Sequence, residues 1–204
     1  MEEKRGGQKY DAILQAAVKV FAQKGFHRSR VSQIAEQAGI GDGTVYLYFH
    51  NKEDILVSLF QERMTDFVYH LRRRLEHTTT FYDTLKILIH YHFEVMEFNP
   101  DQAIVTQFEL RQQNADINEG ISPYLRKYFR IIEEVVDRGK KQGFVKQDIP
   151  TVVARKMIFG TIDEVVTDWV NCNCTDFLKE MTEIVYQLLI YGLLDSKASE
   201  RGNL

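Results

Sequence analysis

Residues 30–56 have the sequence RVSQIAEQAGIGDGTVYLYFHNKEDIL. In the first half of this stretch, apolar side chains recur at intervals of three and four, which predicts a short helix that ends at Gly39. These apolar positions are Val31, Ile34, Ala35 and Ala38. After a turn over residues 39–42, the segment GTVYLYF predicts a second short helix that runs to Phe49 and is capped by Asp42. The stretch therefore predicts two short helices joined by a four-residue turn.

A longer helix is predicted before these two, because apolar residues with helical spacing precede Gly25. Two short helices packed on a longer one form a helix-turn-helix, which places its last helix in the major groove of DNA. On that helix we expect Val45 and Phe49 to pack inward. The outward positions are Thr44, Tyr46, Leu47 and Tyr48. Tyrosines and a leucine suit phosphate hydrogen bonds and thymine methyl groups, although an ordinary three-helix packing unit with solvated tyrosines is the alternative.

Helical patterns continue through the rest of the chain. A long apolar stripe covers residues 52–75, and further patterns cover roughly residues 81–98, 101–115, 122–142, 150–171 and 175–194. Asn99-Pro100, Gly120 and Gly143 separate these patterns. We therefore predict an all-α protein of about nine helices, with a helix-turn-helix domain in residues 1–51 and a larger bundle in residues 52–204.

Composition and charge exclude several classes of protein. The chain has 204 residues, and no apolar run reaches the roughly 18 residues of a membrane span. The polar N-terminus lacks the apolar core of a secretion signal, so we expect a cytoplasmic protein. Residues 1–52 carry 8 Lys and Arg against 5 Asp and Glu, whereas residues 53–204 carry 18 against 24. This mild split is compatible with a polyanionic partner for the first domain alone.

Motifs of enzymes and metal sites are missing from the sequence. It contains no HExxH, no GxSxG and no phosphate-binding loop. His90 and His92 are two residues apart on a predicted helix and do not face each other, and Cys172 and Cys174 are too few for a metal cage. We therefore expect no catalytic residue, no metal and no cofactor. A DNA-binding protein without an effector is the other rival, but it would not need so large a bundle.

The stretch at residues 30–56 resembles the signature of the TetR family of bacterial transcription regulators, through VSQIA, the AG turn, GTVYLYF and NKEDIL. This resemblance implies a homodimer whose paired recognition helices bind a palindromic operator in double-stranded DNA. It also implies that residues 52–204 bind an effector, which controls release from DNA, and form the dimer. By matching position, the residues implied to contact DNA are Ser32, Gly43, Thr44, Tyr46, Leu47, Tyr48, His50 and Lys52.

Two stretches of the bundle resemble a narrower group within that family, the regulators of fatty-acid degradation. These stretches are IVTQFELRQQN at residues 104–114 and ARKMIFGTIDEVVTDWV at residues 154–170. The resemblance implies a repressor of β-oxidation genes that leaves its operator on binding long-chain acyl-CoA. The alternative is a TetR-type repressor of efflux genes that responds to another apolar or cationic molecule such as a drug. A cationic effector would need buried carboxylates, for which Glu94, Glu97 and Glu109 are available.

An acyl-CoA needs an apolar tunnel for its chain and polar or cationic groups for the rest of the molecule. The apolar and aromatic candidates, which would equally suit an ordinary core, are Leu88, Phe93, Ile104, Phe108, Tyr124, Tyr128, Met157, Phe159 and Trp169. Gln107 and Arg111 share a helix face and are candidates for the thioester end, unless Arg111 forms an internal salt bridge with Glu109, Asp163 or Glu164. The cationic candidates for the CoA phosphates include Arg72 and Arg74, and those that we select are Arg73, Arg126, Lys127 and Arg130.

The last two predicted helices are apolar over more than one face, so one flank is left for a partner chain to cover. The residues expected in this dimer interface are Ile162, Val166, Leu188 and Tyr191.

Overall fold

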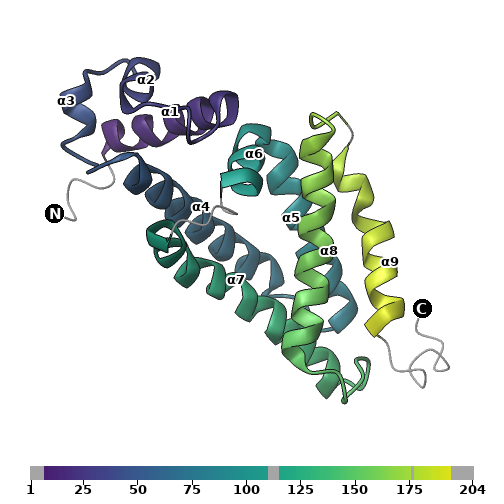
Figure 1. The fold of residues 1–204 in the computed structure, drawn as a ribbon. Helices are drawn as coiled ribbons and strands as arrows, with labels where there is room; N and C mark the ends of the chain where they lie inside the picture. The colour runs from purple at the N-terminus through teal and green to yellow at the C-terminus, as the bar shows by residue number, and fades with distance from the viewer. Residues whose placement is uncertain (1–6, 110–114, 176, 194–204) are drawn as a thin grey trace. The chain divides into compact units, whose positions relative to one another are not determined.

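The structure is a computed structural model that describes residues 7–109, 115–175 and 177–193, without the side chains of Phe108, Glu109 and Asp116. Over these ranges the chain forms α-helices, one 3₁₀ turn (Leu178–Glu180) and no strand, which confirms the all-α fold class (Figure 1). The helices are α1 (Gln8–Lys24), α2 (Val31–Gln37), α3 (Asp42–Val45), α4 (Lys52–Leu75), α5 (Phe81–Phe98), α6 (Pro100–Glu109), α7 (Ala115–Lys141), α8 (Thr151–Asn171) and α9 (Met181–Leu193).

The chain packs as two compact units. Unit 1 consists of residues 1–65 and 99–124, and unit 2 consists of residues 66–98 and 125–204. Both α4 and α7 begin in unit 1 and continue into unit 2. Unit 1 thus includes α6 and the first turns of α7 besides the helix-turn-helix, and the domain boundary expected between residues 51 and 52 stays a prediction.

Unit 1 has its core between α1 and the helix-turn-helix. The inward faces of α1, α2 and α3 are apolar, and α6 packs on α1. Gly39 ends the α2 segment with a φ of +69°, a left-handed conformation that favours glycine, and Ile40 N–H donates to the Ala35 carbonyl. Val45 and Phe49 are fully buried in this core, as expected. The sequence therefore determines the helix-turn-helix through local signals.

Three expectations about helix limits are wrong. The helix α3 ends at Val45 instead of Phe49, and the chain continues to Phe49 in turns with backbone bonds to Thr44 and Val45. Asp42 does not cap α3, because Gly41 occupies the N-cap position without a side-chain bond. Gly120 lies inside α7, which already begins at Ala115, instead of separating two helices. The predicted segment 101–115 crosses residues 110–114, which lie outside the described residues.

Gly120 has a packing reason instead. A Cβ atom built on it would lie 2.6 Å from Cγ1 of Val57 on α4, so the absence of a side chain allows this close approach within unit 1.

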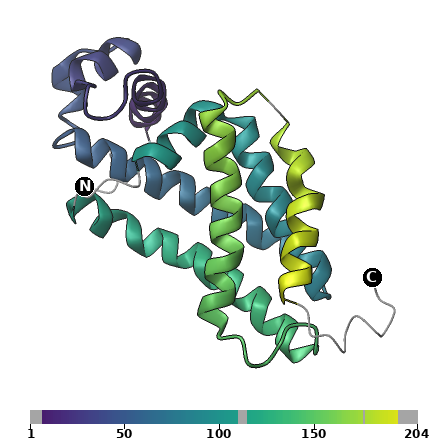
Figure 2. The ribbon, with the colours of Figure 1, turned by 45° about the vertical axis from the view of Figure 1, so that its right-hand side comes forward.

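In unit 2, α5, α8 and α9 lie side by side (Figures 1 and 2). Their facing surfaces are apolar, and the buried residues on α8 and α9 include Ile158, Ile162, Val166 and Leu189. None of the helices in the described ranges combines the length and apolar character needed to cross a membrane.

Candidate functional site

The segment from α2 to the start of α4 presents most of the residues expected to contact DNA. Tyr46 and Leu47 are the most prominent, because 55% and 64% of their surfaces are exposed. Ser32, Gly43 and His50 are also exposed, and the half-buried members of the set are Thr44, Tyr48 and Lys52. An exposed leucine between two tyrosines is costly in water, so this surface is suited to a partner that covers it.

Aromatic and capping contacts fix this surface on unit 1. The ring of Tyr10 stacks on Phe49 with a centroid distance of 5.1 Å and lies 6.4 Å from the ring of Tyr48. Asn51 Oδ1 accepts a hydrogen bond from Asp54 N–H at 2.7 Å, and the Asp54 carboxylate accepts one from His50 N–H at 3.0 Å. These two bonds cap the start of α4 and hold the preceding turn against it.

Lys52 has a different environment from the one that a phosphate contact requires. Its Nζ donates to the carbonyls of Phe26 at 2.7 Å, Ser29 at 3.0 Å and His27 at 3.4 Å, and it lies 4.4 Å from the centroid of the Phe26 ring. An ammonium group has three donors, and all three point into unit 1. A DNA phosphate would have to displace one of these carbonyls, so the geometry favours a role in anchoring the loop between α1 and α2 to α4.

We expect Lys52→Ala to lower the free energy of unfolding by about 1 to 3 kcal/mol, because it removes a cation–π contact and leaves carbonyls unpaired. Urea unfolding measures this effect, with Lys19→Ala on the exposed face of α1 as the control. The dependence of DNA affinity on salt should stay as in the wild type. If the slope of the logarithm of the DNA-binding constant against the logarithm of the salt concentration became shallower by about 0.9 per site, Lys52 would instead contact a phosphate.

The candidates for effector binding lie in both units. Ile104, Gln107 and Tyr124 belong to unit 1, where Gln107 is buried and the other two are half-buried. The side chain of Phe108, together with Arg111, lies outside the described residues. The remaining candidates belong to unit 2 and are Leu88, Phe93, Tyr128, Met157, Phe159 and Trp169.

An aromatic centre in unit 2 gathers side chains from four helices, and we define it as Phe67, Tyr91, His92, Tyr128 and Phe159. The Phe67 ring on α4 lies 5.0 to 5.5 Å, between centroids, from the rings of Tyr91, His92 and Tyr128. The Tyr128 ring lies 6.1 Å from the Phe159 ring on α8. Of these five residues, the sequence pattern indicates Tyr128 and Phe159 as effector candidates, but not Phe67, Tyr91 or His92.

Of the other candidates in unit 2, Leu88 and Phe93 are fully buried on α5. Phe93 directly follows His92 in the sequence, and Leu88 lies about one helical turn before it. Met157 and Trp169 lie elsewhere on α8. Met157 packs beside Gly192 on α9, and Trp169 lines a groove together with Met181. Met157 and Trp169 thus have neighbours other than the aromatic centre, and their contact with an effector stays a prediction.

His92 and Tyr128 form a buried polar pair within the aromatic centre. His92 Nδ1 lies 2.9 Å from the Tyr128 hydroxyl, and both side chains are almost fully buried. Burial lowers the pKa of His92 to about 4 and, together with the charge of Asp163, raises the pKa of Tyr128. Both groups are therefore neutral at pH 7.

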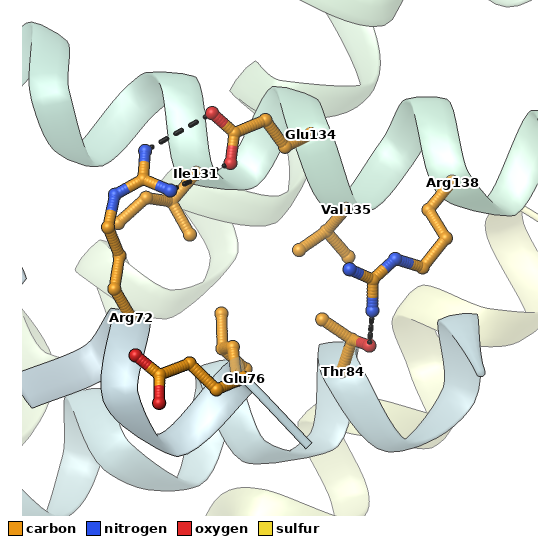
Figure 3. Close-up of a pocket in the computed structure, with 8 residues that line it drawn as sticks. Arg72, Glu76, Thr84, Ile131, Glu134, Val135 and Arg138 are labelled. Carbon is orange, nitrogen blue, oxygen red and sulfur yellow. Dashed lines mark hydrogen bonds and ion pairs between the residues drawn. The ribbon is translucent and has the colours of Figure 1, made fainter. Parts of the chain in front are cut away.

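An open pocket of about 330 Å³ lies between the end of α4, the start of α5 and α7, all within unit 2 (Figure 3). On one side, Arg72 forms a bidentate ion pair with Glu134, with N to O distances of 3.0 and 3.1 Å. On the other side, Arg138 Nη1 donates to the Thr84 hydroxyl at 2.9 Å. The rest of the lining consists of the apolar side chains of Leu75, Ile131 and Val135 and the carboxylate side chain of Glu76.

The cations selected for the CoA phosphates do not line this pocket. Arg73, Arg126, Lys127 and Arg130 are exposed on α4 and α7, and Arg73 lies 6.0 Å from the centre of the Tyr69 ring. The guanidinium groups at the pocket are those of Arg72 and Arg138. The pattern of charge in the sequence could not distinguish these two arginines from the selected cations. Their position at the pocket depends on the approach of α4 to α7.

An exposed apolar stripe runs along α9. Met181, Ile184, Leu188 and Tyr191 recur at helical spacing, and their exposed fractions are 38%, 54%, 64% and 69%. Such a stripe requires a covering surface. By contrast, Ile162 and Val166 have no exposed surface within the single chain. The prediction that these two residues contact a partner is therefore wrong, because they face α5 and α9 instead of solvent.

Comparison with known proteins agrees with this geometry. Residues 13–59 match the family described as "Bacterial regulatory proteins, tetR family", and residues 60–192 match "YsiA-like protein, C-terminal region". The chain is 42% identical to the fatty acid metabolism regulator protein of Bacillus subtilis over 95% of this chain and 98% of that one.

Two solved structures are similar in fold as well as in sequence. The fatty acid degradation regulator FadR from Bacillus halodurans has a TM-score of 0.88 and 46% identity, with 92% of this chain and 97% of that one covered. FadR from Bacillus subtilis in complex with stearoyl-CoA has a TM-score of 0.86 and 42% identity, with 90% and 99% covered.

Proposed function

We propose, from the premise that this chain belongs to the TetR family of bacterial regulatory proteins, that it represses genes of fatty-acid degradation and is released from DNA by long-chain acyl-CoA. The membership makes it a transcriptional regulator and not an enzyme. The observation that carries the acyl-CoA part is the 42% identity, over almost the whole chain, to a regulator whose structure contains stearoyl-CoA. A regulator of this kind acts on the chromosome, so we place it in the cytoplasm.

The helix-turn-helix surface supports the DNA-binding part of the proposal. Tyr46 and Leu47 are exposed beside Gly43, whereas Val45 and Phe49 hold the segment in the core of unit 1. This arrangement presents hydroxyl and apolar groups together, as base edges and phosphates require.

The apolar stripe on α9 supports a homodimer. Its members Leu188 and Tyr191 were expected at the interface, and Ile184 and Met181 extend the same face. A second copy offers the same stripe, so a two-fold axis would pair apolar surface with apolar surface. Two helix-turn-helix domains related by such an axis would read the two halves of a palindromic operator.

The aromatic centre and the open pocket in unit 2 support an amphipathic effector. An acyl chain needs contact with apolar side chains, which the centre supplies, and a CoA moiety needs cationic groups. At the pocket Arg138 supplies such a group, whereas Arg72 is already paired with Glu134. The exposed cations that stay candidates for the CoA phosphates are Arg73, Arg126, Lys127 and Arg130.

The long helix α4 offers a physical link between effector and DNA. It begins at Lys52, which is bonded to the loop between α1 and α2, and it carries Phe67 into the aromatic centre. An effector that changes the position of Phe67 therefore shifts the population of α4 positions, and with it the spacing of the DNA-binding surfaces.

A cationic drug is the second candidate effector, and the described carboxylates do not favour it. Glu94 forms an ion pair with Arg74 at 2.6 Å, and Glu97 forms one with Lys179 at 3.2 Å. The side chain of Glu109 lies outside the description. Two of the three expected carboxylates are thus already neutralised.

We expect stearoyl-CoA to weaken DNA binding by about tenfold or more, which corresponds to a coupling of roughly 1 to 3 kcal/mol. The DNA is a duplex that the protein selects from a randomised pool, and fluorescence anisotropy measures its affinity. Stearate and free CoA serve as controls and should not release the DNA. If the protein binds DNA but stearoyl-CoA leaves the affinity unchanged, the effector part of the proposal fails.

A further inference from the structure

His92 has one polar atom without a hydrogen-bond partner within the aromatic centre of unit 2. Its Nε2 atom is buried and has no hydrogen bond, whereas Nδ1 is bonded to the Tyr128 hydroxyl. The side chain is 5% exposed and is surrounded by the rings of Phe67, Tyr128 and Phe93. An unpaired buried polar atom costs free energy, so such an atom in a native structure indicates a partner that is present only part of the time.

The contact with Tyr128 determines which hydrogen bond Nε2 can form. A buried phenol needs an acceptor for its single hydrogen, and Nδ1 is the acceptor within reach. We therefore assign the ring proton of the neutral imidazole to Nε2. Nε2 is then a donor, and its missing partner is an acceptor.

The surroundings also determine the charge of that acceptor. Burial disfavours a charge on either His92 or Tyr128, as their pKa values indicate. The guanidinium of Arg74 lies 4.6 Å from the centre of the Tyr91 ring, but it is already paired with the Glu94 carboxylate at 2.6 Å. A carboxylate would lose its hydration there without an ionic partner, whereas a neutral carbonyl oxygen needs only one donor. The site thus suits an uncharged carbonyl group attached to an apolar chain.

We propose that His92 Nε2–H donates a hydrogen bond to the thioester carbonyl oxygen of the bound acyl-CoA, and that Tyr128 positions His92 for this contact. The inference rests on the proposed function. The thioester carbonyl is the hydrogen-bond acceptor that is directly attached to the acyl chain. It can therefore enter an aromatic environment together with the chain, with less loss of hydration than the other polar groups of acyl-CoA would suffer. The contact selects the thioester against the free acid.

The same contact acts on α4. The rings of the aromatic centre are packed against one another, with Phe67 lying on both members of the polar pair. A carbonyl group that is bonded to Nε2 would lie among these rings, and Phe67 is carried by α4, which begins at Lys52.

The test compares two ligands on the wild-type protein and on two variants. The ligands are stearoyl-CoA and S-octadecyl-CoA, a thioether in which a methylene group replaces the carbonyl. His92→Asn keeps an amide near the position of Nδ1 but has no atom at Nε2, whereas His92→Gln places its amide nitrogen near Nε2. His90→Asn is the matched control, because His90 is exposed on the same helix. Isothermal titration without DNA measures affinity.

We expect the wild type to bind stearoyl-CoA about tenfold more tightly than the thioether, which is the scale of one buried hydrogen bond. His92→Asn should lose this preference by binding stearoyl-CoA more weakly with thioether affinity unchanged, and His92→Gln should recover part of it. Equal affinity of the wild type for both ligands overturns the inference and leaves the proposed function intact. An equal loss for both ligands in His92→Asn also overturns it, because His92 would then be purely structural. No binding of either ligand to the wild type refutes the proposed function itself.

Discussion

The double variant Tyr46→Ala/Leu47→Ala is expected to bind its operator at least about 30-fold more weakly than the wild type. Each helix-turn-helix loses one hydroxyl and one apolar contact to DNA, for which about 1 kcal/mol is a low value, and a dimer loses this twice. The free energy of unfolding should change by no more than about 0.5 kcal/mol, because both side chains are mostly exposed.

Fluorescence anisotropy on the selected duplex measures the loss, and urea unfolding checks that the fold is retained. Tyr69→Ala is the matched control, since Tyr69 is 56% exposed but lies on α4 in unit 2, outside the DNA-binding surface. An equal loss in the control and the double variant would mean that surface tyrosines act through dimer stability. Unchanged affinity in the double variant would mean that Tyr46 and Leu47, in the turns after α3, do not contact the DNA.

The burial pattern of the helix-turn-helix segment could be predicted because its determinants are local, whereas the end of α3 at Val45 and its missing side-chain cap could not. Gly39, the apolar spacing of α2 and the burial of Val45 and Phe49 all lie within about 20 residues of each other, and helix propensity, turn chemistry and burial agree there. Lys52 is the exception. Its partners are the carbonyls of residues 23 to 26 positions earlier, and a sequence pattern does not indicate which side chain will meet a backbone carbonyl so far away.

The effector region was predictable in composition but not in arrangement. The aromatic residues were recognisable, yet their grouping depends on which faces of α4, α5, α7 and α8 meet. The apolar stripe at residues 52–75 indicates that Phe67 is buried, but not which rings it meets. The spacing of His90 and His92 likewise does not indicate Tyr128, which lies 36 residues from its partner His92. Met157 and Phe159 are two residues apart on α8 and therefore point to different neighbours. Periodicity identifies a buried face but not the partner of that face.

Acidification from pH 7 to below pH 4 is expected to lower the free energy of unfolding by about 3 kcal/mol through His92 alone. The pKa of His92 is about 4 in the folded chain, because burial disfavours the imidazolium, whereas an unfolded histidine titrates near 6.5. Between these values the unfolded state binds the proton and the folded state does not, so stability falls as the pH falls through this window. The pKa of Tyr128 is raised, so its hydroxyl stays neutral throughout.

Urea unfolding at pH 7, 5.5 and 4 measures this contribution as the difference between wild type and His92→Asn. The variant lacks the titrating ring, so its stability should depend less steeply on pH, whereas the exposed His90→Asn control should follow the wild type. If His92→Asn and the wild type lose stability equally, His92 already accepts a proton in the folded chain near pH 6. That result would place a charged imidazolium in the aromatic centre, and the selection of a neutral thioester against a free carboxylate would lose its physical basis. A smaller loss in the variant would establish that the imidazole of His92 is neutral at pH 7, as that selection requires.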